Sequence, residues 1–377
     1  MTSRRGHGEG TIKRRRDGRW EAMISLPNGK RRSVYGKTRK DAQDKLRAAL
    51  REVDAGLNLD SGRQTVDQFL DHWLADVVKA RVRPKTHHDY AQLARLYLKP
   101  ALGRVQLAKL SPAHVQRMMA DMTAKGLSPR TVHYTRAILR SALGQALKWG
   151  IVSRNVATLV DPPRMQKKRV TALTADQARK LLDSVKDQND RLWPLLTVAV
   201  MTGVRQAELL GLRWSDVDLT NNTVHIAHTV QRIDGEWCFV EPKSKRSVRT
   251  LSLTNEAADA FTAQRIRQVE ERLGAGRRWR EMNLVFTSTV GTPLEPSNLN
   301  DRLHVLLDAA GLPKKGMHSL RHCFASVLVS NGVSPRVVME ALGHSQISLT
   351  MDTYAHVMPA ALQDAARVLE DAFAVKD

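Results

Sequence analysis

The first apolar pattern in the chain has a period of two. Within RWEAMISL, residues 19–26, every second side chain is apolar, as in a strand with one buried face: Trp20, Ala22, Ile24 and Leu26. Asp17-Gly18 precedes this stretch and Pro27-Asn28-Gly29 follows it, and both are turn signals between strands. The pattern therefore predicts three short strands over residues 11–35.

A helical repeat follows directly. Thr38 is a suitable N-cap, and the apolar positions after it recur every three or four residues: Ala42, Leu46, Leu50 and Val53. Gly56 is a suitable residue to end this helix. We therefore expect residues 1–60 to form a small domain in which a three-stranded sheet packs on one helix and leaves a basic face exposed.

Residues 64–160 follow a helical period. One apolar stripe lies within FLDHWLADVV: Phe69, Leu70, Trp73, Leu74 and Val77. Ser111-Pro112 and Ser128-Pro129 each place a capping serine before a first-turn proline, and the second pair opens a long helix that ends near Gly150. We expect four helices around one core, with basic side chains left for backbone phosphates: Arg130, Arg136, Arg140 and Lys148.

A basic, proline-containing linker, DPPRMQKKRV, occupies residues 161–170. The sequence from Thr174 to Gln177 then forms a capping box that starts a helix. Residues 223–253 break into short strand-like pieces, and the rest is helical. The expected fold is therefore multidomain and mainly α with small β-sheets (α+β), and the expected domains span residues 1–60, 64–160 and 171–377.

The charge indicates a polyanionic partner. The 377 residues include 60 Lys and Arg against 38 Asp and Glu, a net charge of +22, and residues 1–40 alone hold 13 basic and 3 acidic side chains. Such a surplus favours nucleic acid. A basic surface that is simply solvated is one alternative. An anionic membrane is another, although the N-terminal stretch has no basic amphipathic helix.

The chain has no sequence signal for export or membrane insertion. No run of 18 apolar residues occurs, and no apolar segment follows the basic N-terminus as in a secretory signal. Cys238 and Cys323 are the only cysteines and form no CxxC pair, which argues against a disulfide scaffold or a cysteine-rich zinc module. We expect a reducing cytoplasm.

Candidate chemistry lies in four separated motifs: TGVRQAELLGLRW (202–214), PKSKRSVRTLSL (242–253), HSLRHCFAS (318–326) and LGHSQISLTMDTYAHV (342–357). Taken singly, each has an ordinary explanation. Arg205 could pair with Glu208 one helical turn later, as many surface ions do. Lys243 could be a surface lysine in a hairpin, and Tyr354 could be a core aromatic.

In this order and with these neighbours, the motifs resemble those of the tyrosine recombinases, the phage integrase family. That family's signature is an arginine after Thr-Gly, a hairpin lysine, an HxLRH box, an LGH box and a tyrosine further on. All six positions are filled here: Arg205, Lys243, His318, Arg321, His344 and Tyr354. The resemblance covers nearly the whole chain. It implies an arm-type DNA-binding domain (1–60), a helical core-binding domain (64–160) and a catalytic domain (171–377).

The resemblance implies site-specific DNA recombination by transesterification. Tyr354 would attack a DNA phosphodiester, release a 5′-hydroxyl and form a 3′-phosphotyrosyl bond that a second 5′-hydroxyl reseals. The other positions would supply a phosphate clamp (Arg205, Arg321), a general acid (Lys243), a proton acceptor (His318) and a phosphate hydrogen bond (His344). No cofactor or metal is expected, because the arginines take the place of a Lewis acid.

Alternatives remain open within this interpretation. PKSK contains a second lysine, Lys245, although counting back from the strand RTLSL favours Lys243. A metal hydrolase could use four histidines but lacks a carboxylate ligand among the motifs: His318, His322, His344 and His356. A repressor or architectural protein would explain the charge without the ordered motifs. A type IB topoisomerase shares the chemistry, but the N-terminal sheet domain favours arm-site binding.

The implied partners follow from the same resemblance. They are double-stranded DNA at core and arm attachment sites, three further copies in a homotetramer on DNA, a host DNA-bending protein and an excisionase, and no membrane. The expected location is the cytoplasm of a bacterial host, at the nucleoid. The element could be a phage or another integrative element.

Overall fold

The computed structural model describes residues 11–25, 31–54, 64–165, 172–241 and 245–343. The chain divides into two compact units, Met1–Lys167 and Lys168–Asp377. No helix in the described ranges is long and apolar enough to cross a membrane. The division into three domains stays a prediction.

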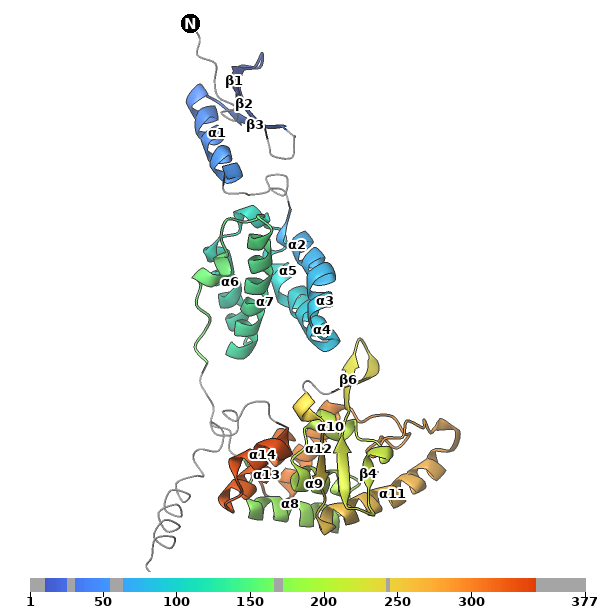
Figure 1. Ribbon diagram of the computed structural model, residues 1–377. Helices are drawn as coiled ribbons and strands as arrows, with labels where there is room; N and C mark the ends of the chain where they lie inside the picture. Colours follow the sequence, from blue (N-terminus) through green and yellow to red (C-terminus); the bar gives the residue numbers. More distant parts are fainter. Residues whose placement is uncertain (1–10, 26–30, 55–63, 166–171, 242–244, 344–377) are drawn as a thin grey trace, which may run out of the picture. The chain divides into compact units, whose positions relative to one another are not determined.

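The first elements are a small sheet and one helix (Figure 1). The sheet has the antiparallel order β1-β2-β3, and the helix follows it: β1 (Thr11–Arg14), β2 (Trp20–Ser25), β3 (Arg31–Gly36) and α1 (Arg39–Asp54). Ala22 and Ile24 face the helix and are buried against Ala42 and Leu46. The predicted three-stranded sheet with one helix is confirmed. Residues 26–30 and 55–63, which hold the second predicted turn and Gly56, lie outside the described residues.

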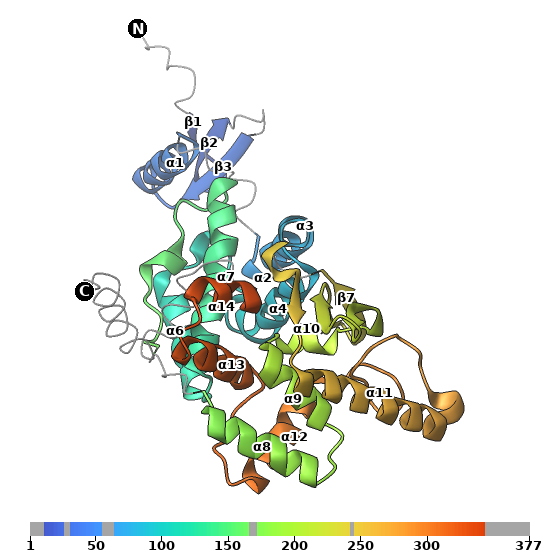
Figure 2. The ribbon, with the colours of Figure 1, turned by 60° about the horizontal axis from the view of Figure 1, so that its bottom comes forward.

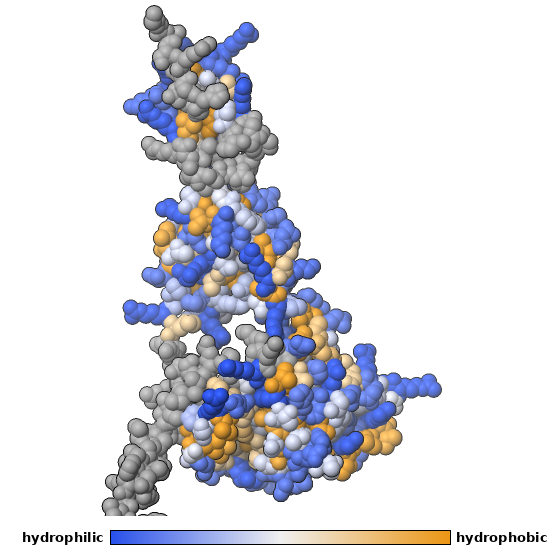
Figure 3. Space-filling model, viewed as in Figure 1, coloured by the Kyte–Doolittle hydropathy of each residue, from blue (hydrophilic) through white to orange (hydrophobic). Residues whose placement is uncertain are grey.

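The open face of this sheet is not uniformly basic. Glu21 lies in the middle strand, directly opposite Lys13 on one side and Tyr35 on the other. The Tyr35 hydroxyl donates to Glu21 Oε1 at 3.3 Å, and Lys13 Nζ lies 3.5 Å from Glu21 Oε2. Figure 3 shows hydrophilic side chains projecting around this part of the chain. A buried carboxylate therefore interrupts the basic face that the sequence predicted.

Four helical rods form the next part, as expected. The first two rods each contain a π-helical stretch: one consists of α2 (Val66–His72), η2 (Trp73–Val78) and α3 (Lys79–Arg81), and the other of α4 (Pro84–Leu93), η3 (Ala94–Leu98) and α5 (Lys99–Leu102). The third rod is α6 (Pro112–Ala124), and the fourth is α7 (Pro129–Lys148). Short 3₁₀ turns lie at η4 (Leu107–Lys109) and η5 (Val156–Leu159). Ser111 and Ser128 are N-caps with proline at the first helical position, so both predicted helix starts are confirmed.

Arg136 is not the surface residue that we expected. It is only 8% exposed, and its Nε is buried without a hydrogen-bond partner. The reason is its position on α7: Val132 lies four residues before it and Leu139 three residues after it, and both are fully buried. Arg130, Arg140 and Lys148 are exposed as predicted.

In the second unit, α9 is the central helix. Most of its side chains are buried, and Figure 2 shows it among α8, α11, α12 and α13. The helices are α8 (Ala175–Asp187), α9 (Trp193–Thr202), α10 (Gln206–Leu210), α11 (Asn255–Ala275), α12 (Pro296–Ala309), α13 (His318–Ser330) and α14 (Pro335–Leu342), with 3₁₀ turns η6 (Trp214–Asp216), η7 (Lys245–Ser247) and η8 (Gly276–Arg278). The predicted capping box is present, because Thr174 Oγ1 accepts from the Gln177 amide at 3.2 Å and Gln177 Oε1 accepts from the Thr174 amide at 3.0 Å.

The strands of this unit form two separate sheets. The strands are β4 (Val217–Asp218), β5 (Thr223–Ile226), β6 (Thr229–Ile233), β7 (Glu236–Val240) and β8 (Arg249–Ser252). One sheet has the order β4-β5-β8, and the other pairs β6 with β7. PKSK was expected in a hairpin, but the described strands before and after it do not pair with each other. The hairpin turn is instead Asp234-Gly235, where both residues have positive φ. Lys243 lies outside the described residues.

Candidate active site

The site begins where α9 ends. Gly203 has a φ of +61°, and a Cβ there would collide with the ring of Phe324 on α13. This left-handed residue turns the chain, so that Arg205 becomes the N-cap of α10. The glycine of the TGVR motif therefore allows α13 to approach closely and places the arginine at the start of a new helix.

Arg205 is held on two sides. Its Nη1 donates to Glu208 Oε1 at 2.6 Å, its backbone N–H donates to Glu208 Oε2 at 3.0 Å, and its Nη2 donates to the Gly343 carbonyl at 2.9 Å. The ordinary ion pair that the spacing offered is therefore present. The side chain nevertheless remains 36% exposed, so that the pair orients the guanidinium without covering it.

Arg321 is much more deeply buried, at 3% exposure. Its Nη1 donates to the Gly203 carbonyl at 2.8 Å and its Nη2 to the Leu342 carbonyl at 2.7 Å. The two predicted arginines thus meet at the end of α14, although 116 positions separate them in the sequence.

His318 is the first residue of α13, and its ring meets the ring of His322 edge to face at 4.6 Å between centroids. Burial lowers the pKa of His318, and the positive charges of Arg321 and Arg205 lower it further. Burial, the neighbouring His318 and Arg321 lower the pKa of His322 to about 4. Both imidazoles are therefore neutral at physiological pH, and His318 is able to accept a proton there.

The sequence named Glu208 as a partner of Arg205, but it missed Arg249, which contacts the same carboxylate. Glu208 is 1% exposed and accepts from Arg249 Nη2 at 3.1 Å through its second oxygen. Burial alone would raise the pKa of Glu208, but the charges and hydrogen bonds of Arg249 and Arg205 outweigh it and hold the pKa below its ordinary value. The sequence contained one signal for this contact. Glu208 lies within the apolar stretch AELLGL, which indicates burial, and a buried charge requires a charged partner.

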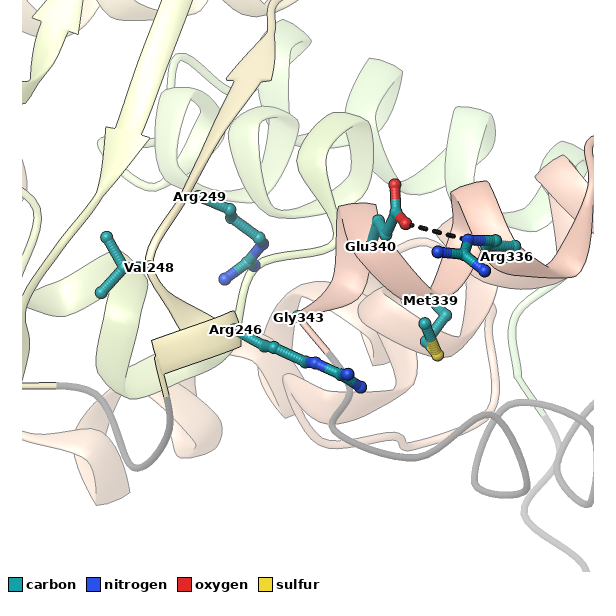
Figure 4. Close-up of a pocket in the computed structure, with 7 residues that line it drawn as sticks. All are labelled: Arg246, Val248, Arg249, Arg336, Met339, Glu340 and Gly343. Carbon is teal, nitrogen blue, oxygen red and sulfur yellow. Dashed lines mark hydrogen bonds and ion pairs between the residues drawn. The ribbon is translucent and has the colours of Figure 1, made fainter.

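A cavity of about 530 Å³ lies beside Arg249 (Figure 4). It lies between β8 with η7 on one side and α14 on the other, and its lining residues are Arg246, Val248, Arg249, Arg336, Met339, Glu340 and Gly343. Arg336 pairs with Glu340 at 3.3 Å on the surface of α14. The cavity therefore opens beside the end of α14, directly before His344.

The structure brings together three of the six predicted site residues: Arg205, His318 and Arg321. The other three, Lys243, His344 and Tyr354, lie outside the described residues. Lys245 begins η7, the turn that leads into β8. In the part of the chain that the structure describes, no group of three or more His, Cys, Asp and Glu side chains is arranged to hold a metal ion.

Comparison with known proteins defines the family. Residues 171–360 match the phage integrase family, and residues 65–123 match the N-terminal SAM-like domain of phage integrases. A tyrosine recombinase XerC-like protein of Caldanaerobacter subterraneus is 30% identical, over 92% of this chain and 93% of its own length. The chain therefore belongs to the phage integrase family. It is a tyrosine recombinase, an enzyme that cleaves and rejoins DNA in the site-specific recombination of mobile elements.

Solved structures support the fold. An integrase of transposon Tn1549, in complex with a circular intermediate DNA, matches with a TM-score of 0.69 and 22% identity, over 81% of this chain and 99% of its own. A lambda integrase tetramer bound to a Holliday junction matches with a TM-score of 0.58 and 19% identity, over 93% and 97%. The predicted fold, mainly helical with small antiparallel sheets, is confirmed.

Proposed function

We propose that this chain is the integrase of a phage or integrative element, and that it acts on double-stranded DNA at attachment sites through a tyrosine-linked intermediate on Tyr354. The observation that carries the proposal is the convergence of Arg205 and Arg321 on the carbonyl end of α14, with the neutral His318 under the influence of both charges. His344 is the next residue after that helix end.

The arginines suit a phosphodiester because its transition state gains negative charge. The two described side-chain hydrogen bonds of Arg205 use two of its five N–H groups, and the remaining donors of this partly exposed fork are positioned for nonbridging oxygens. Arg321 adds a second permanent positive charge at the adjacent carbonyl, that of Leu342. Preorganised donors of this kind supply about 3 kcal/mol each to a transition state.

Proton transfers belong to the other residues. Tyr354 has an ordinary pKa of about 10 and gives up its proton during attack. His318 is neutral and accepts it. The P–O5′ bond breaks as the tyrosyl oxygen bonds to phosphorus, and Lys243 donates the proton that the leaving 5′ oxygen requires. Lys245 is the alternative donor, and His344 hydrogen-bonds a phosphate oxygen.

In this proposal each of the three parts of the chain has its own role on the DNA. Residues 1–60 bind arm-type sites, residues 64–160 bind core sites, and residues 171–377 carry the chemistry. The working assembly is a homotetramer on two DNA sites, as the tetrameric lambda integrase complex supports. A host DNA-bending protein and an excisionase assist it, in the cytoplasm of a bacterial host.

Replacement of Tyr354 by Phe tests the nucleophile. Sequencing the junctions that the protein forms identifies its attachment site, and a nicked duplex of that site is then incubated with protein in EDTA. We expect the wild type to form an SDS-stable protein–DNA adduct and Tyr354→Phe to form none, because only the hydroxyl is lost, while site binding stays unchanged. Tyr97→Phe is the matched control and should retain the adduct. A covalent adduct in Tyr354→Phe would show that another residue attacks.

A further inference from the structure

Three consecutive carbonyls at the end of α14 each accept a hydrogen bond from a different arginine. Ala341 O accepts from Arg249 Nε at 2.6 Å, Leu342 O from Arg321 Nη2 at 2.7 Å, and Gly343 O from Arg205 Nη2 at 2.9 Å. The last carbonyls of a helix lack partners within it and carry partial negative charge. Three guanidiniums therefore stabilise the point from which the chain continues to His344.

Arg249 differs from the other two donors. Its side chain is only 7% exposed, and all three of its nitrogens are engaged: besides Ala341 O, Nη1 donates to Ser247 O at 2.9 Å and Nη2 to Glu208 Oε2 at 3.1 Å. Figure 4 shows it extending from β8 toward the end of α14. Arg249 is consequently a fixed connection between elements, and its guanidinium is not presented to a phosphate.

Each acceptor of Arg249 belongs to a segment with a proposed catalytic residue. Glu208 orients Arg205 through its other oxygen. Ala341 precedes His344 by three positions. Ser247 ends the turn η7, which follows the segment that contains Lys243, here called the lysine segment. One side chain therefore links the three segments. Glu208 is almost fully buried, so that, among the described residues, loss of Arg249 would leave its carboxylate with Arg205 as its one remaining cationic partner.

We propose that Arg249 is a positioning residue for DNA cleavage: it fixes Glu208, and thereby Arg205, together with the end of α14 and the turn after the lysine segment. This inference rests on the proposed function of the site. A purely structural ion pair makes a different prediction, because removing one partner of a buried pair destabilises the fold without slowing the enzyme that remains folded.

The test is Arg249→Met in the full chain, measured by single-turnover adduct formation on the nicked attachment-site duplex. We expect unchanged site affinity and adduct formation slowed by about a hundredfold, as for small misplacements of catalytic groups. We also expect a new loss of rate on acidification, because Glu208 protonates more easily without its neighbouring charge. Glu208→Gln added to Arg249→Met should remove that additional acidic step, since no carboxylate remains at position 208 to titrate.

Arg191→Met is the matched control. Arg191 binds Glu271 through two nitrogens and also donates to Thr287 O, on elements that carry none of the proposed catalytic residues. It should retain the wild-type adduct rate and pH profile. Arg249→Lys keeps the charge but cannot reach three acceptors at once, so it should be slow as well. This variant carries the test if Arg249→Met does not fold.

The outcomes separate the two proposals. If the wild type forms no adduct, the proposed function fails, whatever Arg249 does. If the wild type forms the adduct and Arg249→Met matches it in rate and pH profile, only the positioning role fails. If Arg249→Met is unfolded, the same comparison is made with Arg249→Lys.

Discussion

The two histidines at the start of α13 show how burial among arginines sets the state of a titrating residue. His318 and His322 lie one helical turn apart with their rings in contact, and Arg321 depresses both pKa values. In the proposed mechanism, a neutral His318 is the form that can accept the proton of Tyr354. The lowered pKa of His322 should have a measurable effect on the free energy of unfolding.

Stability should fall when the pH drops from about 6.5 toward 4. In this window the unfolded chain binds a proton at His322 that the folded chain does not bind, because the folded pKa is lowered to about 4. The free energy of unfolding therefore rises with pH there. His322→Gln should lose less thermal stability than the wild type between pH 7 and pH 5, followed by tryptophan fluorescence. His304→Gln on α12 is the control, and an identical acid loss in wild type and His322→Gln would refute the assignment.

At this scale the sequence identified the residue types and the Glu208 partner of Arg205, but not the backbone acceptors. Motif order was enough to single out Arg205, His318 and Arg321. The carbonyl of Gly343, which holds Arg205, is 138 positions away from it, and no side-chain pattern marks a backbone acceptor. Arg136 was misplaced for a related reason: charge suggested a surface position, whereas the helical stripe of Val132 and Leu139 decided its burial.

Among elements, the strands of the second unit departed furthest from expectation. The helices could be predicted from caps and period, as at Thr174 and Ser128, because those signals are local. Strand pairing is not local: β8 pairs with β5 across more than twenty intervening residues, and the β6–β7 hairpin lies between them. Asp234-Gly235 was the turn signal that could have revealed this hairpin.

The connection that leads into β8 contains the two candidate acids. Lys243→Ala should slow cleavage of an ordinary phosphodiester by about 10²- to 10⁴-fold, the usual contribution of a general acid. A 5′-phosphorothiolate substrate should be cleaved at nearly the wild-type rate, because sulfur leaves without a proton. The two substrates are compared in single-turnover reactions of each variant. Lys245→Ala is the matched control, and rescue in Lys245→Ala instead of Lys243→Ala would exchange the two roles.

Across the whole molecule, positive charge is unevenly distributed. Residues 1–40 contain 13 of the 60 Lys and Arg with only 3 acidic residues, and the strands of this segment pack with α1 around a small core of their own. A basic segment with its own core suits the DNA-binding role proposed for residues 1–60. Glu21 on its open face adds an acceptor that a purely phosphate-binding surface would not need.

Removal of residues 1–63 should therefore separate the two kinds of DNA site. We expect residues 64–377 to retain core-site protection and adduct formation, but to lose arm-site protection and efficient integration. Fewer phosphate contacts should also make binding to a duplex with both site types less steeply dependent on salt. Footprinting of the full chain and the fragment, with circular dichroism to confirm folding, measures this. Equal footprints at both site types would place arm-site binding elsewhere in the chain.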